Sequence, residues 1–237
     1  MRVDVWSDVV CPFCYIGKKR LEAAAAATGV ELEVHWHSFQ LDPDAPPRQE
    51  VSNSERLALK YGRTVAEVEE MQRNIAEMAK AEGIEFNWEN ANSGNTFNAH
   101  RIIHHSQSLG LGSEAKEAFF YSYMTQGLAI GERETLEDVA SRIGLNPVEV
   151  DDILDSDQYA DFVQFDEELA RDQLKVTSVP FFVFDQRVAL AGAQPTQVFQ
   201  DVINKVLATA NEQADQPTVE DAETCTDEHC DVPPSKS

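Results

Sequence analysis

The sequence of 237 residues predicts an α/β protein in which a long block of helices interrupts a small sheet. Strand patterns occupy residues 3–6 and 31–37, and strand patterns return at residues 179–190. Between them, from about residue 52 to residue 172, one helical pattern follows another. A hydrophobic content of 42% is sufficient for a substantial core.

The first predicted strand leads directly into a helix. Residues 3–6 alternate β-branched or aromatic side chains with a polar one, which is typical of a strand. An alanine-rich helix follows and is expected to end at Gly29. A helix of this length allows the second strand, residues 31–37, to run parallel to the first. On that second strand, His35 and His37 share the polar face, and we expect them to face solvent.

Helix-capping patterns mark the beginning of the helical block. Ser52 with Glu55 and Thr64 with Glu67 form two possible capping boxes. The two helices that follow are expected to end at glycines. Further helices are predicted at residues 97–108, from Ser113 to about residue 126, from Thr135 to Gly144, from Asn146 onward, and at residues 157–172.

The chain then returns to strand and ends its ordered part in a helix. Residues 179–184 and 187–190 predict a hairpin with a tight turn at Asp185 and Gln186, and a last helix runs from Pro195 to about residue 210. This order of elements is that of a thioredoxin-like fold with an inserted helical domain. We therefore expect four parts, namely 1–48 and 173–210 for the thioredoxin-like domain, 49–172 for the inserted domain, and 211–237 for an acidic flexible tail.

Two cysteines lie where the first strand gives way to the first helix. Cys11-Pro12-Phe13-Cys14 places Cys11 at or just before the first helical turn, and Pro12 suits a first helical position. Unpaired backbone N–H groups there favour a thiolate, and the first cysteine of such a pair has a thiol pKa between about 3.5 and 7 instead of about 8.5. Cys14, one turn on, can resolve a mixed disulfide. Half of a zinc knuckle has the same spacing, but no second ligand pair lies within the usual ~12–20 residues.

Composition and charge exclude several classes of partner. The net charge of −23 makes a nucleic-acid partner improbable, because such binding depends on Lys and Arg. No apolar run approaches the ~18 residues that a membrane span needs. The first residues show no secretory signal, so we expect a cytoplasmic protein. Structural disulfides are rare in the cytosol, so the four cysteines are expected to be catalytic or metal-binding.

Three segments together resemble a known family. These are Ser7-Asp8 before the Cys11–Cys14 motif, Asn98-Ala99-His100-Arg101 in mid-helix, and Val176-Thr177-Ser178-Val179-Pro180-Phe181-Phe182. They resemble the DsbA-like oxidoreductases, most closely the FrnE branch, over about residues 1–210. The resemblance implies a thioredoxin fold with a helical insertion and a disulfide oxidase or isomerase without a cofactor. Its substrates would be proteins or small thiols and disulfides.

The resemblance also implies roles for individual residues. Cys11 would be the exposed nucleophile and Cys14 the resolving thiol. Pro180 would form a cis peptide after Val179, in a segment that faces the sulfurs and docks substrate. From the residues alone, cis and trans at this proline stay open. Pro12 and Phe13 would lie against substrate.

His100 has two interpretations. It either lines the cleft from the helical domain or packs as an ordinary helix residue. A metal site at His100 and His104, spaced i and i+4, lacks an obvious third ligand.

Two departures and one alternative accompany the resemblance. Phe13 stands where many relatives have Trp or His, and a phenyl ring cannot hydrogen-bond a thiolate, which argues against a strongly oxidising pair. Ser178 replaces a glycine often found before the Val-Pro pair. The wider family includes kappa-like glutathione-dependent isomerases and transferases, which usually carry Ser at the first motif position. Cys11 therefore favours redox chemistry.

The tail carries a second pair of cysteines, Cys225 and Cys230. Our hypothesis is that this pair relays disulfides with the first, because a tethered dithiol has a high effective concentration. Metal binding is the competing interpretation, because Cys225, His229 and Cys230 offer soft ligands. Incidental thiols in a solvated tail are the third.

Overall fold

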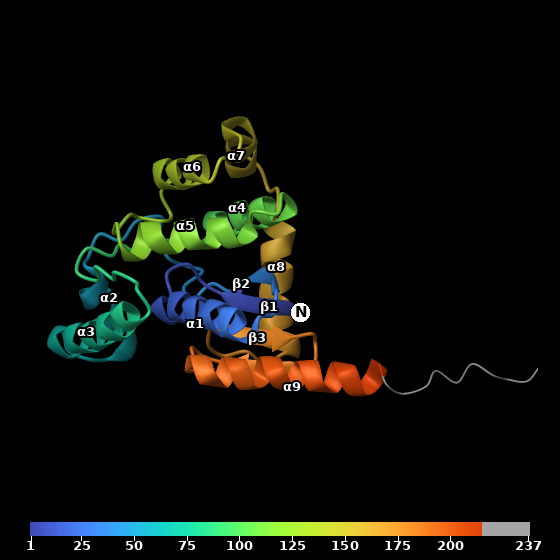
Figure 1. Cartoon of the computed structure of the whole chain (residues 1–237). Helices are drawn as coiled ribbons and strands as arrows, with labels where there is room; N and C mark the ends of the chain where they lie inside the picture. Colours follow the sequence, from blue (N-terminus) through green and yellow to red (C-terminus); the bar gives the residue numbers. More distant parts are fainter. Residues whose placement is uncertain (215–237) are drawn as a thin grey trace, which may run out of the picture.

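The protein, described as a computed structural model over residues 1–214, is built on a four-stranded mixed sheet with helices on both sides (Figure 1). The strands are β1 (Arg2–Ser7), β2 (Glu33–Ser38), β3 (Phe181–Phe184) and β4 (Val188–Ala191), in the order β2-β1-β3-β4. Residues from both ends of the chain share this sheet, and the helical block lies between β2 and β3 in sequence. The predicted α/β class, a thioredoxin fold with a helical insertion, is confirmed.

Strand β1 is the centre of the sheet and leads to the cysteine motif. It pairs in parallel with β2, where Val5 lies opposite Trp36, and antiparallel with β3, where Val5 lies opposite Phe182. Every β1 residue after Arg2 is buried, because helices cover both faces. A strand with no solvent-facing side is rigid, so the residues at its carboxyl end are held firmly.

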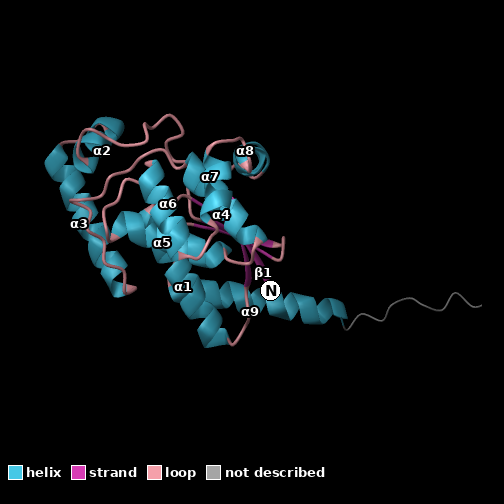
Figure 2. Ribbon diagram, turned by 90° about the horizontal axis from the view of Figure 1, so that it is seen from above, coloured by secondary structure: helices cyan, strands magenta, loops and turns pink. Residues whose placement is uncertain are grey.

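Helices cover the two faces of the sheet. Figure 2 shows α1 (Pro12–Thr28) and α9 (Thr196–Ala214) on one side of the strands, and α4 (Phe97–Ser108) and α8 (Ala160–Glu168) on the other. Helix α9 continues four residues past its predicted end near residue 210. The remaining helices are α2 (Asn53–Tyr61), α3 (Val65–Ala81), α5 (Gly112–Met124), α6 (Arg133–Arg142), α7 (Pro147–Leu154) and a π-helical turn at Leu169–Gln173.

Local chemistry explains where several helices begin. Both capping boxes, Ser52 with Glu55 and Thr64 with Glu67, are formed, and the Asn146 side chain accepts from the N–H of Val148. The predicted start at Ser113 is wrong, because its hydroxyl instead accepts a hydrogen bond from Trp36 Nε1 at 3.1 Å. The predicted start at Thr135 is also wrong, since α6 begins two residues earlier.

The predicted helix over residues 157–172 is divided in the structure. Tyr159 has a φ of 63°, a left-handed conformation, so α8 begins only at Ala160. The π-helical turn then replaces its last part. The hairpin prediction is confirmed, since Asp185 and Gln186 have φ values of 44° and 56° and the N–H of Arg187 donates to the carbonyl of Phe184.

A buried carboxylate on α8 ties that helix to the sheet. Asp166 accepts from His37 Nδ1 at 2.6 Å and from the Ser38 N–H at 2.7 Å, and its other contact is His104 Nε2 at 3.1 Å. The second ring nitrogen of His37 lies 3.0 Å from Asp4, and the ring stacks on Trp6. The expectation that His37 faces solvent is therefore wrong, because both ring nitrogens contact carboxylates. The sequence pattern could not show the contact with Asp166, which lies more than 100 residues away in the chain.

Candidate active site

Cys11 stands at the junction between β1 and α1. It is the residue before α1, with extended φ and ψ of −95° and 111°. Its N–H donates to the carbonyl of Asp8 at 3.1 Å, and its own carbonyl accepts from the N–H of Cys14 at 3.0 Å. Both cysteines are free thiols. The Cys11 sulfur therefore lies at the amino end of a helix whose first turn carries no acidic residue.

The loop before β3 lies against this sulfur. The Val179–Pro180 peptide is cis, as the resemblance implied. The Cys11 thiol lies 3.7 Å from the Val179 carbonyl oxygen, to which it donates. The structure thus brings together Cys11 and the Val179–Pro180 segment, which are 168 residues apart.

Gly17 allows the close approach of α1 to the proline loop. A Cβ atom at this position would lie 3.0 Å from Pro180 Cγ and 3.1 Å from Phe182 Cζ, which is tighter than an ordinary contact. Pro180 and Phe182 are both buried. The glycine in the motif is therefore needed for the packing that holds the two halves of the site together.

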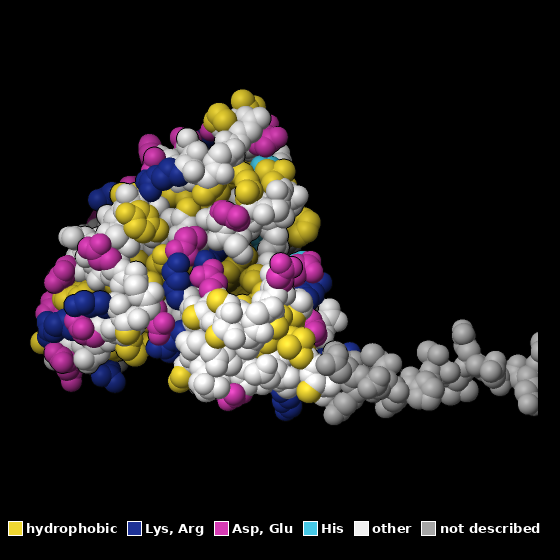
Figure 3. Space-filling model, viewed as in Figure 1, with side chains coloured by type: hydrophobic (Ala, Val, Ile, Leu, Met, Phe, Trp, Pro, Cys, Tyr) yellow, Lys and Arg dark blue, Asp and Glu magenta, His cyan; other side chains and the backbone are white. Residues whose placement is uncertain are grey.

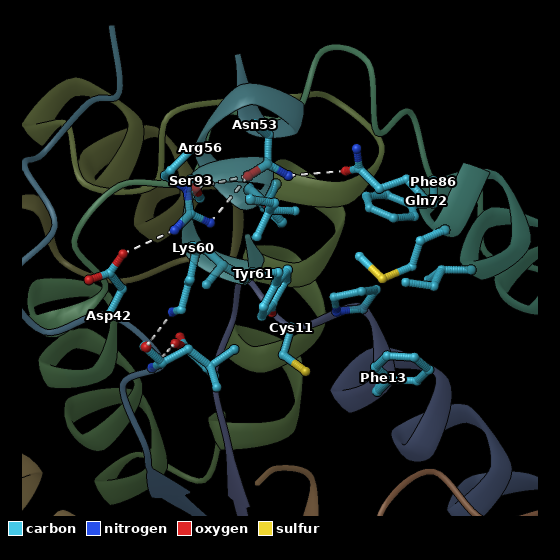
Figure 4. Close-up of a pocket in the computed structure, with 18 of the residues that line it drawn as sticks. Cys11, Phe13, Asp42, Asn53, Arg56, Lys60, Tyr61, Gln72, Phe86 and Ser93 are labelled. Atoms are coloured by element: carbon cyan, nitrogen blue, oxygen red, sulfur yellow. Dashed lines mark hydrogen bonds and ion pairs between the residues drawn. The ribbon is translucent and has the colours of Figure 1, made fainter. Parts of the chain in front are cut away.

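Cys11 is more enclosed than the sequence suggested. Its exposed fraction is 5% and that of Cys14 is 1%, whereas Phe13 between them is 38% exposed. The expectation that the Cys11 side chain is exposed on the protein surface is therefore wrong. Cys11 instead lines a cavity of about 540 Å³ between the motif and helices α2 and α3 (Figure 4). Exposed residues such as Tyr61 also line this cavity, so the cavity opens to solvent and gives small molecules access to Cys11.

The second cysteine is held as a neutral thiol. Burial raises the pKa of Cys14 well above its ordinary value, and the neighbouring Cys11 raises it further. Lys116 acts in the opposite direction. The two cysteines therefore have different environments, as a nucleophile and a resolving thiol require.

Two buried charged residues beneath the motif were not predicted as site residues. The Asp8 carboxylate is fully buried and accepts from the N–H of Leu41 at 2.8 Å. The Lys116 ammonium, from α5, is also fully buried; it donates to the Ser7 carbonyl at 3.1 Å and lies 5.5 Å from the Trp36 ring centroid. Burial lowers the pKa of Lys116 to about 8. A lysine inside a helix pattern normally indicates a solvent face, so the sequence carried no signal for this position.

His100 does not line the cleft. It is 1% exposed and lies behind Asp8, with 3.4 Å between its Nε2 atom and Asp8 Oδ1. Burial lowers the pKa of His100, so the ring is neutral at pH 7. The interpretation of His100 as a substrate contact is therefore wrong, and its other interpretation, a packed helix residue, fits the structure. Asp8 separates it from the cavity.

Other predicted features have separate outcomes. Within residues 1–214, no three His, Cys, Asp or Glu side chains are grouped to hold a metal ion, and His104 contacts Asp166 and Ser38. None of the helices in the described part of the chain has the length and apolarity to cross a membrane. Cys225, His229 and Cys230 lie outside the described residues.

Comparison with known proteins identifies the family. Residues 2–204 match the model of the DSBA-like thioredoxin domain. A crystal structure described as a probable DsbA oxidoreductase from Streptomyces coelicolor is 34% identical, with a TM-score of 0.83 over 98% of this chain and 99% of that one. The uncharacterized protein YwbO of Bacillus subtilis is 27% identical over 86% of this chain and 96% of its own length.

A more distant structure shares the fold. The cytosolic disulfide reductase DsbM from Pseudomonas aeruginosa, solved with GSH, is 17% identical with a TM-score of 0.62 over 88% of this chain and all of that one. The chain belongs to the family of DSBA-like thioredoxin domains.

Proposed function

We propose that this protein is a thiol–disulfide oxidoreductase that acts through Cys11 and Cys14. The observation that carries the proposal is the position of Cys11, at the amino end of α1, 3.7 Å from the Val179 carbonyl and facing a cavity. Relatives with this fold are described as a probable DsbA oxidoreductase and as a disulfide reductase. Proteins and small disulfides are the proposed substrates.

In the first step the Cys11 thiolate attacks one sulfur of a substrate disulfide. A bond forms between Cys11 and that sulfur, the substrate S–S bond breaks, and the second substrate sulfur leaves as a thiolate that takes up a proton. The N–H groups of the first turn of α1 and the helix dipole favour the attacking thiolate. The Val179–Pro180 segment, beside the sulfur, offers backbone groups against which substrate docks.

In the second step Cys14 releases the substrate. It loses its proton, attacks the Cys11 sulfur and breaks the bond between Cys11 and the first substrate sulfur, which leaves as a thiolate and takes up a proton. The enzyme disulfide forms, and two electrons have passed to the substrate. The high pKa of Cys14 keeps it a thiol before the mixed disulfide forms. Run in reverse, the same steps oxidise a dithiol, and a stalled mixed disulfide allows isomerisation.

Serine variants test the proposal. We expect Cys11→Ser to abolish insulin reduction and the refolding of a scrambled substrate. We expect Cys14→Ser to accumulate a mixed disulfide, because the resolving thiol is gone, and mass spectrometry detects the added mass. If Cys11→Ser retains wild-type exchange, or if alkylation shows Cys11 reacting no faster than an ordinary thiol at neutral pH, the proposal is wrong.

We further propose that Cys225 and Cys230 relay disulfides to the first pair. The support is the sequence alone, since a tethered dithiol reaches a high effective concentration near its partner. Replacing both by serine is expected to slow insulin reduction and to change the redox state of Cys11. Unchanged rates and redox state would exclude the relay, and protection of the tail thiols on zinc titration would favour metal binding. Assignment to the FrnE branch and a cytoplasmic location stay predictions.

A further inference from the structure

The cavity that holds Cys11 has the size of a small-molecule site. Its volume of about 540 Å³ lies within the usual range of roughly 300–1,000 Å³ for ligand pockets. In Figure 4, Arg56 and Lys60 lie on one side, Phe13 and Phe86 on the opposite side, and Cys11 between them. A ligand in the cavity would therefore contact the reactive sulfur, an apolar wall and a basic rim.

The wall of the cavity is largely apolar. Besides Phe13 at the motif, α2 and α3 contribute aliphatic, thioether and aromatic side chains, and Phe86 and Tyr123 come from outside those helices; the main contributors are Leu57, Tyr61, Met71, Ile75, Met78 and Phe86. Methionine and aromatic side chains adapt to ligands of irregular shape. The deep polar groups of α2 are already engaged, since Asn53 donates to Gln72 at 3.2 Å.

The rim of the cavity carries two cations that form no salt bridge in the described part of the chain. Lys60 donates to the Leu41 carbonyl at 3.1 Å, and Arg63 interacts with the Glu67 carboxylate only through space. Arg56 is different, because it pairs with Asp42 at 3.0 Å. Lysine and arginine side chains gather with acidic ones over α2 and α3 in Figure 3.

The acidic side chains that also line the cavity are occupied elsewhere. Asp42 is held by Arg56, Glu67 caps α3 through Thr64, and Glu70 pairs with Arg73 at 2.8 Å. Asp8 is fully buried beneath the motif. Because these acidic groups are buried or engaged, Lys60 and Arg63, which form no salt bridge among the described residues, are the charged groups of the lining that suit an anionic group.

We propose that this cavity binds a low-molecular-weight disulfide or thiol with an apolar body and one anionic group at its end. The apolar body lies between Phe13 and Phe86, the anionic group reaches Lys60 and Arg63, and the sulfur meets Cys11. This inference rests on the proposed thiol–disulfide exchange and names the substrate class. The exposed fraction of Cys11, 5%, favours a slender substrate that enters the cavity over a folded protein surface.

The reaction balances without another reagent. The reduced enzyme and a small disulfide RSSR give the Cys11–Cys14 disulfide and two molecules of RSH. Two electrons pass from the enzyme sulfurs to the substrate sulfurs, and the two thiol protons end on the leaving thiolates.

A series of small disulfides tests the substrate class by stopped-flow kinetics with the reduced full-length protein. The probes are 5,5′-dithiobis(2-nitrobenzoate), which is aromatic and anionic; 4,4′-dithiodipyridine, which is aromatic and neutral; and glutathione disulfide, which is polar. Each rate is divided by that of the same disulfide with dithiothreitol, which removes intrinsic reactivity. We expect the normalised rates to fall in the order given, with glutathione disulfide slowest.

Two variants separate charge from apolar contact. Replacing Lys60 and Arg63 together by glutamine is expected to lower the normalised rate of the anionic probe by about 3- to 10-fold and to leave the neutral aromatic probe unchanged. The matched control replaces Lys80 and Lys205, which lie outside the cavity, by glutamine. It is expected to change the normalised rate of neither probe. Met71→Gln is expected to slow both aromatic probes by about 5-fold.

A probe that cannot exchange keeps this inference separable from the proposed function. The thioether S-methyl-5-thio-2-nitrobenzoate is titrated by calorimetry into the Cys11→Ser variant, which has no attacking sulfur. We expect saturable binding that the Lys60 and Arg63 replacements weaken by the same factor. Absence of binding, or glutathione disulfide reacting fastest after normalisation, would overturn the inference even if exchange at Cys11 is confirmed. Binding of the thioether together with inactive cysteines would instead overturn the proposed function.

Discussion

Lys116 is the residue whose position most changes the chemistry expected of the site. It is fully buried beneath the cysteine motif, with its ammonium against the Ser7 carbonyl and the Trp36 and Phe120 rings. A buried cation normally needs compensation. Here the Asp8 and Asp166 carboxylates provide negative charge nearby, and a cysteine thiolate adds to it when Cys14 or Cys11 ionises, so these groups counteract the lowering of the Lys116 pKa by burial. We therefore interpret Lys116 as a positioning residue that stabilises the thiolate of Cys14.

The variant Lys116→Met tests this role. Removing the cation is expected to raise the pKa of Cys14 further and to slow the resolution of a mixed disulfide by about 3- to 10-fold at pH 7. The rate of resolution is measured against pH, because a purely structural role would not move that profile. Lys18→Met is the control, since Lys18 is also buried but pairs with Glu22 and Glu117. An unchanged pH profile in Lys116→Met would contradict the role.

His37 makes stability depend on pH. Burial alone would lower the pKa of His37, but hydrogen bonds to Asp166 and Asp4 outweigh it and raise the pKa to about 9. Because the folded value exceeds the unfolded value of 6.5, the stabilisation is fully present below pH 6.5 and is lost as pH rises through 9. This stabilisation is on the order of 3 kcal/mol, because each pKa unit corresponds to about 1.4 kcal/mol.

Urea denaturation between pH 6 and pH 10 checks this dependence. Lys116 acts in the opposite sense, since its folded pKa of about 8 lies below its unfolded value of 10.5, so stability rises with pH between them. The difference between wild type and His37→Gln isolates the histidine. We expect the difference in unfolding free energy to shrink from pH 6.5 to pH 9, and a constant difference would refute the assignment.

At the scale of elements, the site depends on the contact between α1 and the loop before β3. Gly17→Val would place a Cβ 3.0 Å from Pro180 Cγ, and both Pro180 and Phe182 are buried and cannot move freely. We expect this variant to lose about 2 kcal/mol of unfolding free energy and to exchange disulfides more slowly. Ala23→Val, on the exposed side of the same helix, is the control and is expected to lose about 0.5 kcal/mol. Equal stability of the two variants would show that the contact is not tight.

The helices also differ in how far local sequence decides them. Capping boxes at Ser52 and Thr64 were predicted, because their reciprocal hydrogen bonds involve residues three apart. The starts of α5 and α6 were not, and at Ser113 the hydroxyl bonds Trp36 on a distant strand. A side chain with a competing long-range partner is unavailable as a cap.

At the scale of the whole molecule, net charge opposes folding. A chain with a formal charge of −23 repels itself in the compact state, and salt screens that repulsion. We expect the melting temperature at pH 7 to rise by about 3–6 °C between 0.05 and 0.5 M NaCl. Near pH 4.5, the isoelectric point, the same salt change should have little effect, and equal shifts at both pH values would argue against charge repulsion.

The candidate active site is assembled from four separate parts of the chain. The segment between β1 and α1 supplies Asp8 and Cys11, the loop before β3 supplies Val179, α5 supplies Lys116, and α2 with α3 completes the cavity. The helical insertion therefore contributes both the wall of the cavity and the buried cation. The proposed substrate cavity and the proposed cysteine chemistry thus both depend on the insertion.

The amino-acid sequence by itself determined the order of strands and helices, the cysteine motif at a helix start and the turn at Asp185 and Gln186. These features depend on periodicity and on contacts between near neighbours, which a pattern records. Only the tertiary structure decided that Cys11 lies inside a cavity, that His100 packs behind Asp8, that Lys116 is buried, and that His37 is half-buried between Asp4 and Asp166. Burial and pairing of a charged side chain depend on partners tens of residues away, and those partners become neighbours only when the sheet and the helices pack.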